Sequence, residues 1–515
     1  MAYVIAVDVG TTCLKACLFE TKPQLKMINN AEADYEVFPM ENGGMEQDHD
    51  QWWAALCKAT KELIKTSEIA PEEISGFSVC AQMLGLALVD RDGVPVHRPM
   101  NYLDRRGVEE RRKGMGGGIK VADVNIRKLL TSLHLTKVAP LDVADTVWKY
   151  KWIEAHEPEN FAKAYKWLDV KDYLNMRCTD RMVMTEDSAY TTMLYENKGG
   201  KKRFSSRIMK MYGVNEEHMP EVIGSTDIVG TLTAKAAEEM GLAEGTPVFG
   251  GGGDASCITL GSGHVEVGKT HIYIGTSGWV STVCDTQPFD PINMIASLYG
   301  AEEGRFNYHA EMNAAGKCFE WLHEAFGKEA TYDELNQAAK GAPAGAGGVI
   351  FAPWLAGERC PNNITDPCGM FYNLNLRTDR GALVRAVMEG VAYHIKLMME
   401  KHEKKVPIGP VIRLVGGGAL SSIGGQILAD ITGRHIEVIY WPQYAGAVGA
   451  AVISAVGLGI IPGFEAVKDY VPIEKNFTPN KENREVYERQ YEVYKKIYST
   501  NKKLLRTLNK PRGNE

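Results

Sequence analysis

One short pattern occurs once in each half of the chain and limits its fold more than any other feature. In the first half, the apolar run 4–7 leads into Asp8-Val9-Gly10-Thr11-Thr12, and apolar residues then alternate with others as far as Leu18. In the second half, residues 271–274 lead into Gly275-Thr276-Ser277-Gly278 and another alternating run. Each copy predicts two strands joined by a tight turn. Two such hairpins predict a nucleotide held in a cleft between two similar domains.

The first of these turns carries groups that suit a phosphate. It offers backbone N–H groups, the hydroxyls of Thr11 and Thr12, and the nearby cation Lys15. Asp8 would lie at the end of the first strand, where its carboxylate could hold Mg²⁺ through water. An ordinary hairpin turn explains this copy equally well when it is taken alone, and the second copy is what favours phosphate binding.

Near the midpoint of the chain, the four glycines 250–253 separate an apolar run from Asp254. Residues without a Cβ let the backbone approach a ligand closely. Apolar residues resume at Cys257, which predicts a helix that opens near Asp254. An ordinary capped turn is the alternative, since Asp is a common N-cap residue. Four glycines exceed what a turn needs, so Asp254 is a candidate to face whatever lies between the two halves.

Length, charge and cysteine use narrow the class of protein. At 515 residues the chain exceeds what one core usually supports, so two domains are expected, and its net charge of −7 argues against a nucleic-acid surface. Ten scattered cysteines without a CxxC pair fit reduced, buried thiols better than disulfides or a zinc site. No export signal is visible, and the glycines and proline of the uncharged run 446–463 suit an internal helix better than a membrane span. We expect a cytoplasmic protein.

Several further segments carry weaker signals. Gln82, Asp104 and Arg106 follow predicted strands and could bond sugar hydroxyls, although ordinary loop chemistry explains them as well. Gly316 interrupts a helical pattern, which suggests close approach by a ligand or another helix. The strand 412–415 ends in glycines before a helix that starts near Ser421 or Ser422 and stops at Gly433, a suitable platform for a nucleotide. The stretches 145–196 and 482–508 are expected to be helical.

Taken together and in chain order, these motifs resemble the FGGY family of carbohydrate kinases, nearest to the xylulokinases. The match runs almost from end to end. In the first half it comprises Asp8-Val9-Gly10-Thr11-Thr12, Glu46-Gln47-Asp48 with Trp52-Trp53, Gln82-Met83 with Gly85, Asp104 with Arg106, and Lys171-Asp172-Tyr173. In the second half it comprises Gly251-Gly252-Gly253-Asp254, Gly275-Thr276-Ser277, Gly357-Glu358-Arg359, Arg385-Ala386 with Glu389-Gly390, and Gly416-Gly417-Gly418-Ala419 with Ala429-Asp430.

The resemblance implies an α/β protein of two actin-like ATPase (ribonuclease-H-like) domains with an interdomain cleft. Residues 1–246 would form the sugar-binding side and 247–515 the ATP-binding side. Asp254 would be the base that accepts the proton of the sugar hydroxyl, and Asp8 would support Mg²⁺ and the transferred phosphoryl group. The sugar would meet Gln82, Met83, Leu84, Asp104 and Asp254. ATP would meet Thr11, Thr12, Lys15, Gly275, Thr276, Gly316, Glu320, Gly417, Gly418 and Ser422.

Two departures from the xylulokinase pattern fall where the sugar would bind. The family usually has Gln-Met-His-Gly where this chain has Leu84, and Asn after the catalytic Asp where this chain has Ala255. Losing two polar partners should change which sugar is preferred, because a site that bonds hydroxyls discriminates strongly. D-xylulose is therefore one option beside other ketoses, polyols and aldonates.

Two other kinds of protein remain open. One is a nucleotide-driven binding protein of the actin or chaperone type, which would not need a carboxylate after a glycine run. The other is a degenerate kinase that senses a sugar without phosphorylating it. The expected partners are a small sugar and ATP, without nucleic acid or membrane; the oligomeric state is open, with a homodimer as one option.

Overall fold

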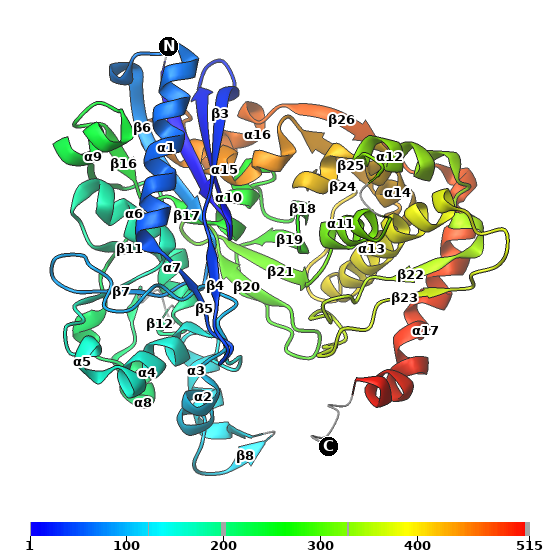
Figure 1. Ribbon diagram of the computed structural model, residues 1–515, viewed down its shortest axis with the longest axis horizontal. Coiled ribbons are helices and arrows are strands. Elements are labelled where there is room, and N and C mark those ends of the chain that lie inside the picture. Colours follow the sequence, from blue (N-terminus) through cyan, green and yellow to red (C-terminus); the bar gives the residue numbers. More distant parts are fainter. Residues whose placement is uncertain (1, 122, 197–201, 327–328, 510–515) are drawn as a thin grey trace. The chain divides into compact units, whose positions relative to one another are not determined.

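The computed structural model describes residues 2–121, 123–196, 202–326 and 329–509, which form two compact units (Figure 1). The first unit holds residues up to Gly263 together with 298–305 and 444–470, and the second holds 264–297, 306–443 and the chain from Val471 onward. These units differ from the continuous halves 1–246 and 247–515 expected from the sequence, because 247–253 pairs with the first sheet and 444–470 returns to it. The division into a sugar-binding and an ATP-binding half stays a prediction.

The described part of the first unit is organised around a mixed sheet in the order β15-β16-β6-β1-β2-β3, and β17 also pairs with β6. β1 is parallel to β6, which is parallel to β16 and β17, whereas β1, β2 and β3 are antiparallel neighbours. The expected first hairpin is thus confirmed. The strands are β1 (Tyr3–Val9), β2 (Cys13–Glu20), β3 (Lys26–Asp34), β6 (Ile74–Ala81), β15 (Ile228–Thr231), β16 (Pro247–Phe249) and β17 (Gly252–Gly253).

Two apolar helices complete the core of this sheet. α15 (Ala445–Gly457) packs against β1 and β6, and it also lies against α10 (Asp254–Gly261) (Figure 1). A Cβ added at Gly449 would overlap the carbonyl oxygen of Cys257, so glycine permits this close helix pairing. The expected internal helix in 446–463 is therefore confirmed. Within the described residues, no helix has the length and apolar character needed to cross a membrane.

Smaller elements of the first unit surround the sheet. The stretch 145–196 was expected to be helical, but short strands interrupt its helices. After the strand that ends at Leu168, Asp169 caps a new helix, and Asp180, at φ 59°, ends that helix before the next strand. These elements are α1 (His49–Ser67), β4 (Val37–Pro39), β5 (Met45–Gln47), β7 (Ala87–Val89), α2 (Val108–Gly114), β8 (Lys120–Val121), β9 (Val124–Asn125), α3 (Ile126–Leu135), α4 (Thr146–His156), α5 (Pro158–Phe161), β10 (Lys166–Leu168), α6 (Val170–Thr179), β11 (Val183–Thr185), α7 (Glu186–Thr191), β12 (Tyr195–Glu196), β13 (Arg203–Phe204), α8 (Ser206–Tyr212), β14 (Glu221–Ile223), α9 (Ala234–Met240) and α16 (Val467–Tyr470).

The second unit repeats the hairpin-and-parallel-strand plan. Its sheet includes the order β21-β19-β18-β24-β25-β26, with β18 antiparallel to β19 and parallel to β24. The second hairpin, the helix after the 416–418 glycines and the long terminal helix are all confirmed. The elements are β18 (Thr270–Ile274), β19 (Gly278–Cys284), β21 (Phe306–Met312), α11 (Gly316–Ala325), α12 (Tyr332–Gly341), β22 (Ile350–Ala352), β23 (Met370–Tyr372), α13 (Arg380–His402), β24 (Val411–Val415), α14 (Ser422–Thr432), β25 (His435–Ile439), β26 (Ile473–Phe477) and α17 (Arg484–Leu508).

Candidate active site

Three adjacent parallel strands of the first unit end at the same edge of the sheet. Asp8 of β1 lies beside Cys80 of β6, and Cys80 lies beside Gly252 of β17. Gln82 directly follows β6 and Asp254 directly follows β17. In open α/β sheets, ligands bind outside the carboxyl ends of the strands. The structure therefore brings together Asp8, Gln82 and Asp254, which lie far apart in the sequence.

Asp8 is held between a lysine and the start of a helix. It pairs across the hairpin with Lys15, and a Cβ added at Gly446, in the first turn of α15, would overlap its Oδ2 atom. The N-terminus of a helix favours a negative charge. Burial raises the pKa of the Asp8 carboxyl, while Lys15 and a hydrogen bond with Cys80 act in the opposite direction. A cation bound here would stabilise the ionised form further.

Asp254 is the first residue of α10 rather than its N-cap, a position taken by Gly253. Its Oδ1 atom accepts a hydrogen bond from the Ala255 N–H at 2.7 Å, and its side chain is half-buried. Close packing explains the glycines: Gly251 has φ +73°, and a Cβ at Gly253 would overlap Met83. One carboxylate oxygen of Asp254 therefore satisfies an N–H group of the first turn of α10.

A chain of amides connects the strand ends to the first hairpin turn. Gln82 Nε2 donates to Gln47 Oε1 at 2.7 Å, and Gln47 Nε2 donates to the Thr11 carbonyl at 2.6 Å. Gln82 Oε1 is buried and has no hydrogen-bond partner among the described residues. A buried polar atom without a partner is costly, so a ligand hydroxyl or water would fit here. Gln47 was absent from our predicted site, although it belongs to the Glu46-Gln47-Asp48 motif.

The loop after Gln82 has a strained backbone. Leu84 has φ +62°, a left-handed conformation that costs a non-glycine residue about 1 kcal/mol or more. Its carbonyl accepts from Lys149 Nζ at 2.7 Å, and the next N–H, that of Gly85, donates to Asp169 Oδ1 at 3.0 Å. Burial lowers the pKa of Lys149 to about 8 and raises the pKa of Asp169 to about 7. Sequence reasoning gave no role to Lys149 or Asp169.

Asp104 is placed differently from the other predicted sugar residues. Its side chain is fully buried, and Arg106 binds it through Nε and Nη2 at 3.1 and 2.8 Å. The Met45 N–H also donates to it, at 2.8 Å, and the Arg106 guanidinium lies over the ring of Trp152. Both carboxylate oxygens are therefore engaged within the protein.

In the second unit, the Gly-Thr turn is the meeting point of three glycine segments. The Gly316 N–H, at the start of α11, donates to the Gly275 carbonyl at 2.8 Å, and the Ala315 N–H donates to the Thr276 carbonyl at 3.0 Å. A Cβ on Gly316 would lie 2.5 Å from the Gly275 oxygen, and one on Gly418 would overlap Ile274. The structure thus gathers Gly275, Thr276, Gly316 and Gly418 at one end of β18 and β24.

The other nucleotide residues predicted in the second unit lie on the surface near this cluster. Ser422 is the exposed first residue of α14, and Ser421 is its N-cap, which accepts from the Gly424 N–H at 3.0 Å. Gly417 is exposed and has open space around it. Glu320 pairs with Lys317 at 3.0 Å on the outer face of α11. Exposed N–H groups at a helix start can bind anions.

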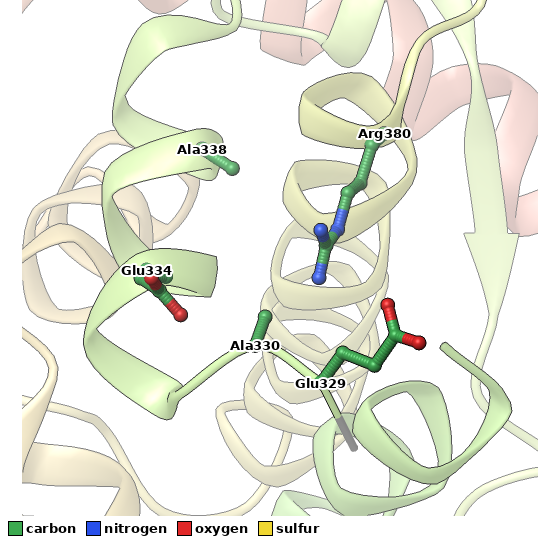
Figure 2. Close-up of a pocket in the computed structure, with 5 residues that line it drawn as sticks. All are labelled: Glu329, Ala330, Glu334, Ala338 and Arg380. Atoms are coloured by element: carbon green, nitrogen blue, oxygen red, sulfur yellow. The ribbon is translucent and has the colours of Figure 1, made fainter. Parts of the chain in front are cut away.

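One surface pocket of the second unit lies apart from these residues (Figure 2). It measures about 320 Å³ and is lined by Glu329, Ala330, Glu334, Ala338 and Arg380. Arg380 extends toward Glu329 from the start of α13, and Glu334 and Ala338 come from α12. None of the predicted site residues lines this pocket, so we assign it no part in the site.

A magnesium ion would have to rely on few protein ligands. Among the described residues, no group of three or more His, Cys, Asp and Glu side chains is arranged to hold a metal. Mg²⁺ commonly uses one or two carboxylates, several waters and the phosphates of its substrate. A half-buried Asp8 beside a turn predicted to bind phosphate fits that mode of binding.

A hairpin with a Gly-Thr turn in each unit and carboxylates at the edge of the first sheet are the arrangement expected of a phosphotransferase of the sugar-kinase class. The chain belongs to the FGGY family of carbohydrate kinases: the N-terminal domain of the family matches residues 3–261 and the C-terminal domain matches residues 271–458. Its expected membership, two-domain fold and kinase class are confirmed.

Known relatives are similar along nearly the whole chain. It is 28% identical over 468 residues to "Xylulose kinase" of Bacillus subtilis, covering 90% of each protein. It is 27% identical over 485 residues to "L-xylulose/3-keto-L-gulonate kinase" of Escherichia coli, covering 91% of each. The fold is similar to the crystal structure of ligand-bound xylulose kinase from Lactobacillus acidophilus, with a TM-score of 0.85, 21% identity, and 97% and 98% of the two chains covered.

Proposed function

We propose that this kinase transfers the terminal phosphoryl group of ATP to a hydroxyl of a small ketose-like sugar, with Asp254 as general base. The observation that carries the proposal is the meeting of Asp8, Gln82 and Asp254 at the ends of three adjacent parallel strands. A carboxylate, a buried amide oxygen without a partner and a turn with exposed hydroxyls are groups that suit such a reaction.

Phosphoryl transfer passes through a loose transition state, so the protein mainly positions the reactants and offsets charge. Asp254 orients the attacking hydroxyl and takes its proton late, when bonding to phosphorus has made that oxygen acidic. Thr11, Thr12 and Lys15 of the first unit bind the terminal phosphates. The second unit contributes Gly275, Thr276, Gly316, Glu320, Gly417, Gly418 and Ser422 to ATP. Asp8 would hold Mg²⁺ through water, and that ion would offset charge on the phosphates.

The sugar is selected by the loop that follows β6. Gln82 supplies a hydrogen bond, Met83 packs beside Gly253, and Leu84 offers an apolar surface where xylulokinases usually have an imidazole. The named relatives act on xylulose or on L-xylulose and 3-keto-L-gulonate, as their names state. Leu84 and Ala255 remove two polar partners, so our candidates are D-xylulose and, beside it, other ketoses, polyols and aldonates. Asp104, bonded within the protein, would shape the site through Arg106.

A panel of pentuloses, hexuloses, polyols and aldonates tests the proposal. With Mg-ATP present, at least one panel member should raise ADP release well above the rate seen with no sugar. ADP release at the same rate with and without every panel member would contradict it. Sugar binding without ADP release would instead support a sugar-sensing protein.

A methyl group at the start of α15 should disturb Asp8 without disturbing the fold. Gly446→Ala places a Cβ where Asp8 Oδ2 lies, and alanine is the better helix former. We expect kcat to fall at least about tenfold, which corresponds to about 1.4 kcal/mol, while the melting temperature stays within a few degrees. Steady-state kinetics and thermal melts measure the two effects. Gly463→Ala, in the same unit with open space around the new methyl, is the control and should leave kcat unchanged.

A further inference from the structure

One peptide group of the sugar-selecting loop is bound on both sides by buried charges. The carbonyl of Leu84 accepts from Lys149 Nζ, and the N–H of Gly85 donates to Asp169 Oδ1. Lys149 is 1% exposed and comes from α4, whereas Asp169 is 4% exposed and is the N-cap of α6. Two separate helices thus fix the orientation of a single amide plane.

The same peptide sits where the backbone is strained. Leu84 adopts a left-handed conformation that only glycine takes without cost. Gly85 has no room for a side chain, since a Cβ there would lie 2.6 Å from Asp169 Oδ1 and 2.9 Å from Val170. A strained conformation persists only where its surroundings hold it in place. Lys149 and Asp169 bond to the carbonyl oxygen of Leu84 and the N–H of Gly85. The orientation of this peptide group depends on the backbone angles of Leu84, so the two bonds hold those angles in place.

The need to fill space in the core does not explain why residue 149 is a lysine. Burying an ammonium group is costly, and an apolar side chain of similar length would occupy the same volume more cheaply. Four carboxylates, of Asp104, Asp169, Asp145 and Asp142, offset the charge. The Nζ atom also has a defined acceptor, the Leu84 carbonyl.

The residues on either side of this peptide group contact the segments that carry the predicted reacting groups. Met83, next to Leu84, packs so closely on Gly253 that a Cβ there would overlap it, and Gly253 precedes Asp254. On the other side, Gln82 bonds to Gln47 and its N–H donates to the Val9 carbonyl. Rotating the Leu84–Gly85 peptide would therefore move the side chains that flank the sugar.

We propose that Lys149 and Asp169 are positioning residues that hold Leu84 in its left-handed conformation and thereby set affinity and selectivity for the sugar. The inference rests on the proposed function, because it concerns the loop assigned to the sugar. It assigns these residues no contact with the sugar or with ATP.

The test compares kinetic constants for the best sugar of the panel and for ATP. Lys149→Met should raise the sugar KM at least about tenfold while the ATP KM stays within about twofold. Lys151→Met, on the same helix but bonded to Glu154 and the Gly213 carbonyl, is the matched control and should leave both constants unchanged. Asp169→Asn keeps an acceptor for the Gly85 N–H and should retain a nearly normal sugar KM, whereas Asp169→Ala should not.

A comparison of the two KM values with the melting temperature separates positioning from general stability. Positioning predicts that the sugar KM rises while the ATP KM does not, whereas a role in stability alone predicts that both KM values and the melting temperature change together. If Lys149→Met does not fold, the Asp169→Asn and Asp169→Ala pair carries the test.

The outcomes are distinguishable from failure of the proposed function. An active wild-type enzyme whose sugar KM is unchanged by Lys149→Met and Asp169→Ala would overturn the inference alone. Equal sugar KM values for Asp169→Asn and Asp169→Ala would do the same. A wild-type protein that neither binds nor phosphorylates any panel member, as judged by calorimetry and ADP release, would overturn both.

Discussion

Replacing Asp254 by asparagine will lower sugar-dependent turnover at least about a hundredfold while Mg-ATP still binds. Asparagine has nearly the same shape, and its Oδ1 atom can still accept the Ala255 N–H that Asp254 accepts at 2.7 Å. What it loses is the ability to take a proton from the attacking hydroxyl. Steady-state ADP release measures the turnover, and calorimetric titration with Mg-ATP measures binding.

The matched control for this variant is Asp92→Asn, which changes an exposed aspartate of a surface turn in the same unit. Its turnover should equal that of the wild type. Turnover of Asp254→Asn within a few fold of the wild type would refute the role of general base, whatever the sugar. Loss of Mg-ATP binding together with turnover would indicate that Asp254 supports the site rather than the proton transfer.

Acidification from pH 7 to pH 5 will destabilise the second unit more than the first. Burial lowers the pKa values of histidines in the second unit to about 4 for His264, His309, His394 and His402, and to about 3 for His271. In the unfolded chain each would titrate near 6.5. The unfolded state therefore binds more protons between these values, and stability falls as the pH drops through this window. The loss should be roughly 1–2 kcal/mol for each histidine at pH 5.

Glu358 and Glu389 act in the opposite direction, but they are fewer than the five histidines. Burial raises the pKa of both carboxyls, that of Glu358 well above the usual range, and Glu358 lies 3.2 Å from His394 Nε2. The stability that these protonated carboxyls contribute is lost as the pH rises and is therefore recovered on acidification. Hydrogen exchange at pH 7, 6 and 5, corrected for intrinsic rates, should show protection falling first in the second unit.

Two histidine variants provide the comparison for this prediction. His271→Gln keeps an acceptor for the Trp279 indole N–H, which His271 Nε2 accepts at 3.0 Å, and should make stability less dependent on pH. His134→Asn, at an exposed position of α3, should leave the pH dependence of stability unchanged. Equal loss of protection in both units, or the same pH dependence in wild type and His271→Gln, would contradict the account.

Local patterns in the sequence predicted the parts of the fold that depend on near neighbours. The two hairpins, the helix after the 416–418 glycines and the internal helix in 446–463 all follow from apolar periodicity and glycine placement, and the structure has each of them. Glycine placement in the sequence also marked the segment before Asp254 as one where the backbone packs closely. Gly251 and Gly253 prove to lie where side chains would overlap β6 and Met83.

Such local patterns could not predict contacts between distant segments of the chain. Nothing local shows that 444–470 returns to the first unit, where Gly446 meets Asp8. Asp104 was predicted as a sugar ligand from its place after a strand, but its oxygens bind Arg106 and the Met45 N–H. Leu84, Gly85 and Gln82, which bond to Lys149, Asp169 and Gln47 in the site, lie more than thirty positions away from them, so only folding brings these pairs together.

The most direct measurement follows both products in one tube by ³¹P NMR, using Mg-ATP and the best sugar of the panel. The account predicts that a sugar phosphomonoester and ADP appear in equal amounts, and that neither accumulates with Asp254→Asn. Inorganic phosphate in place of the phosphomonoester, or ADP formed equally fast when the sugar is omitted, would contradict it.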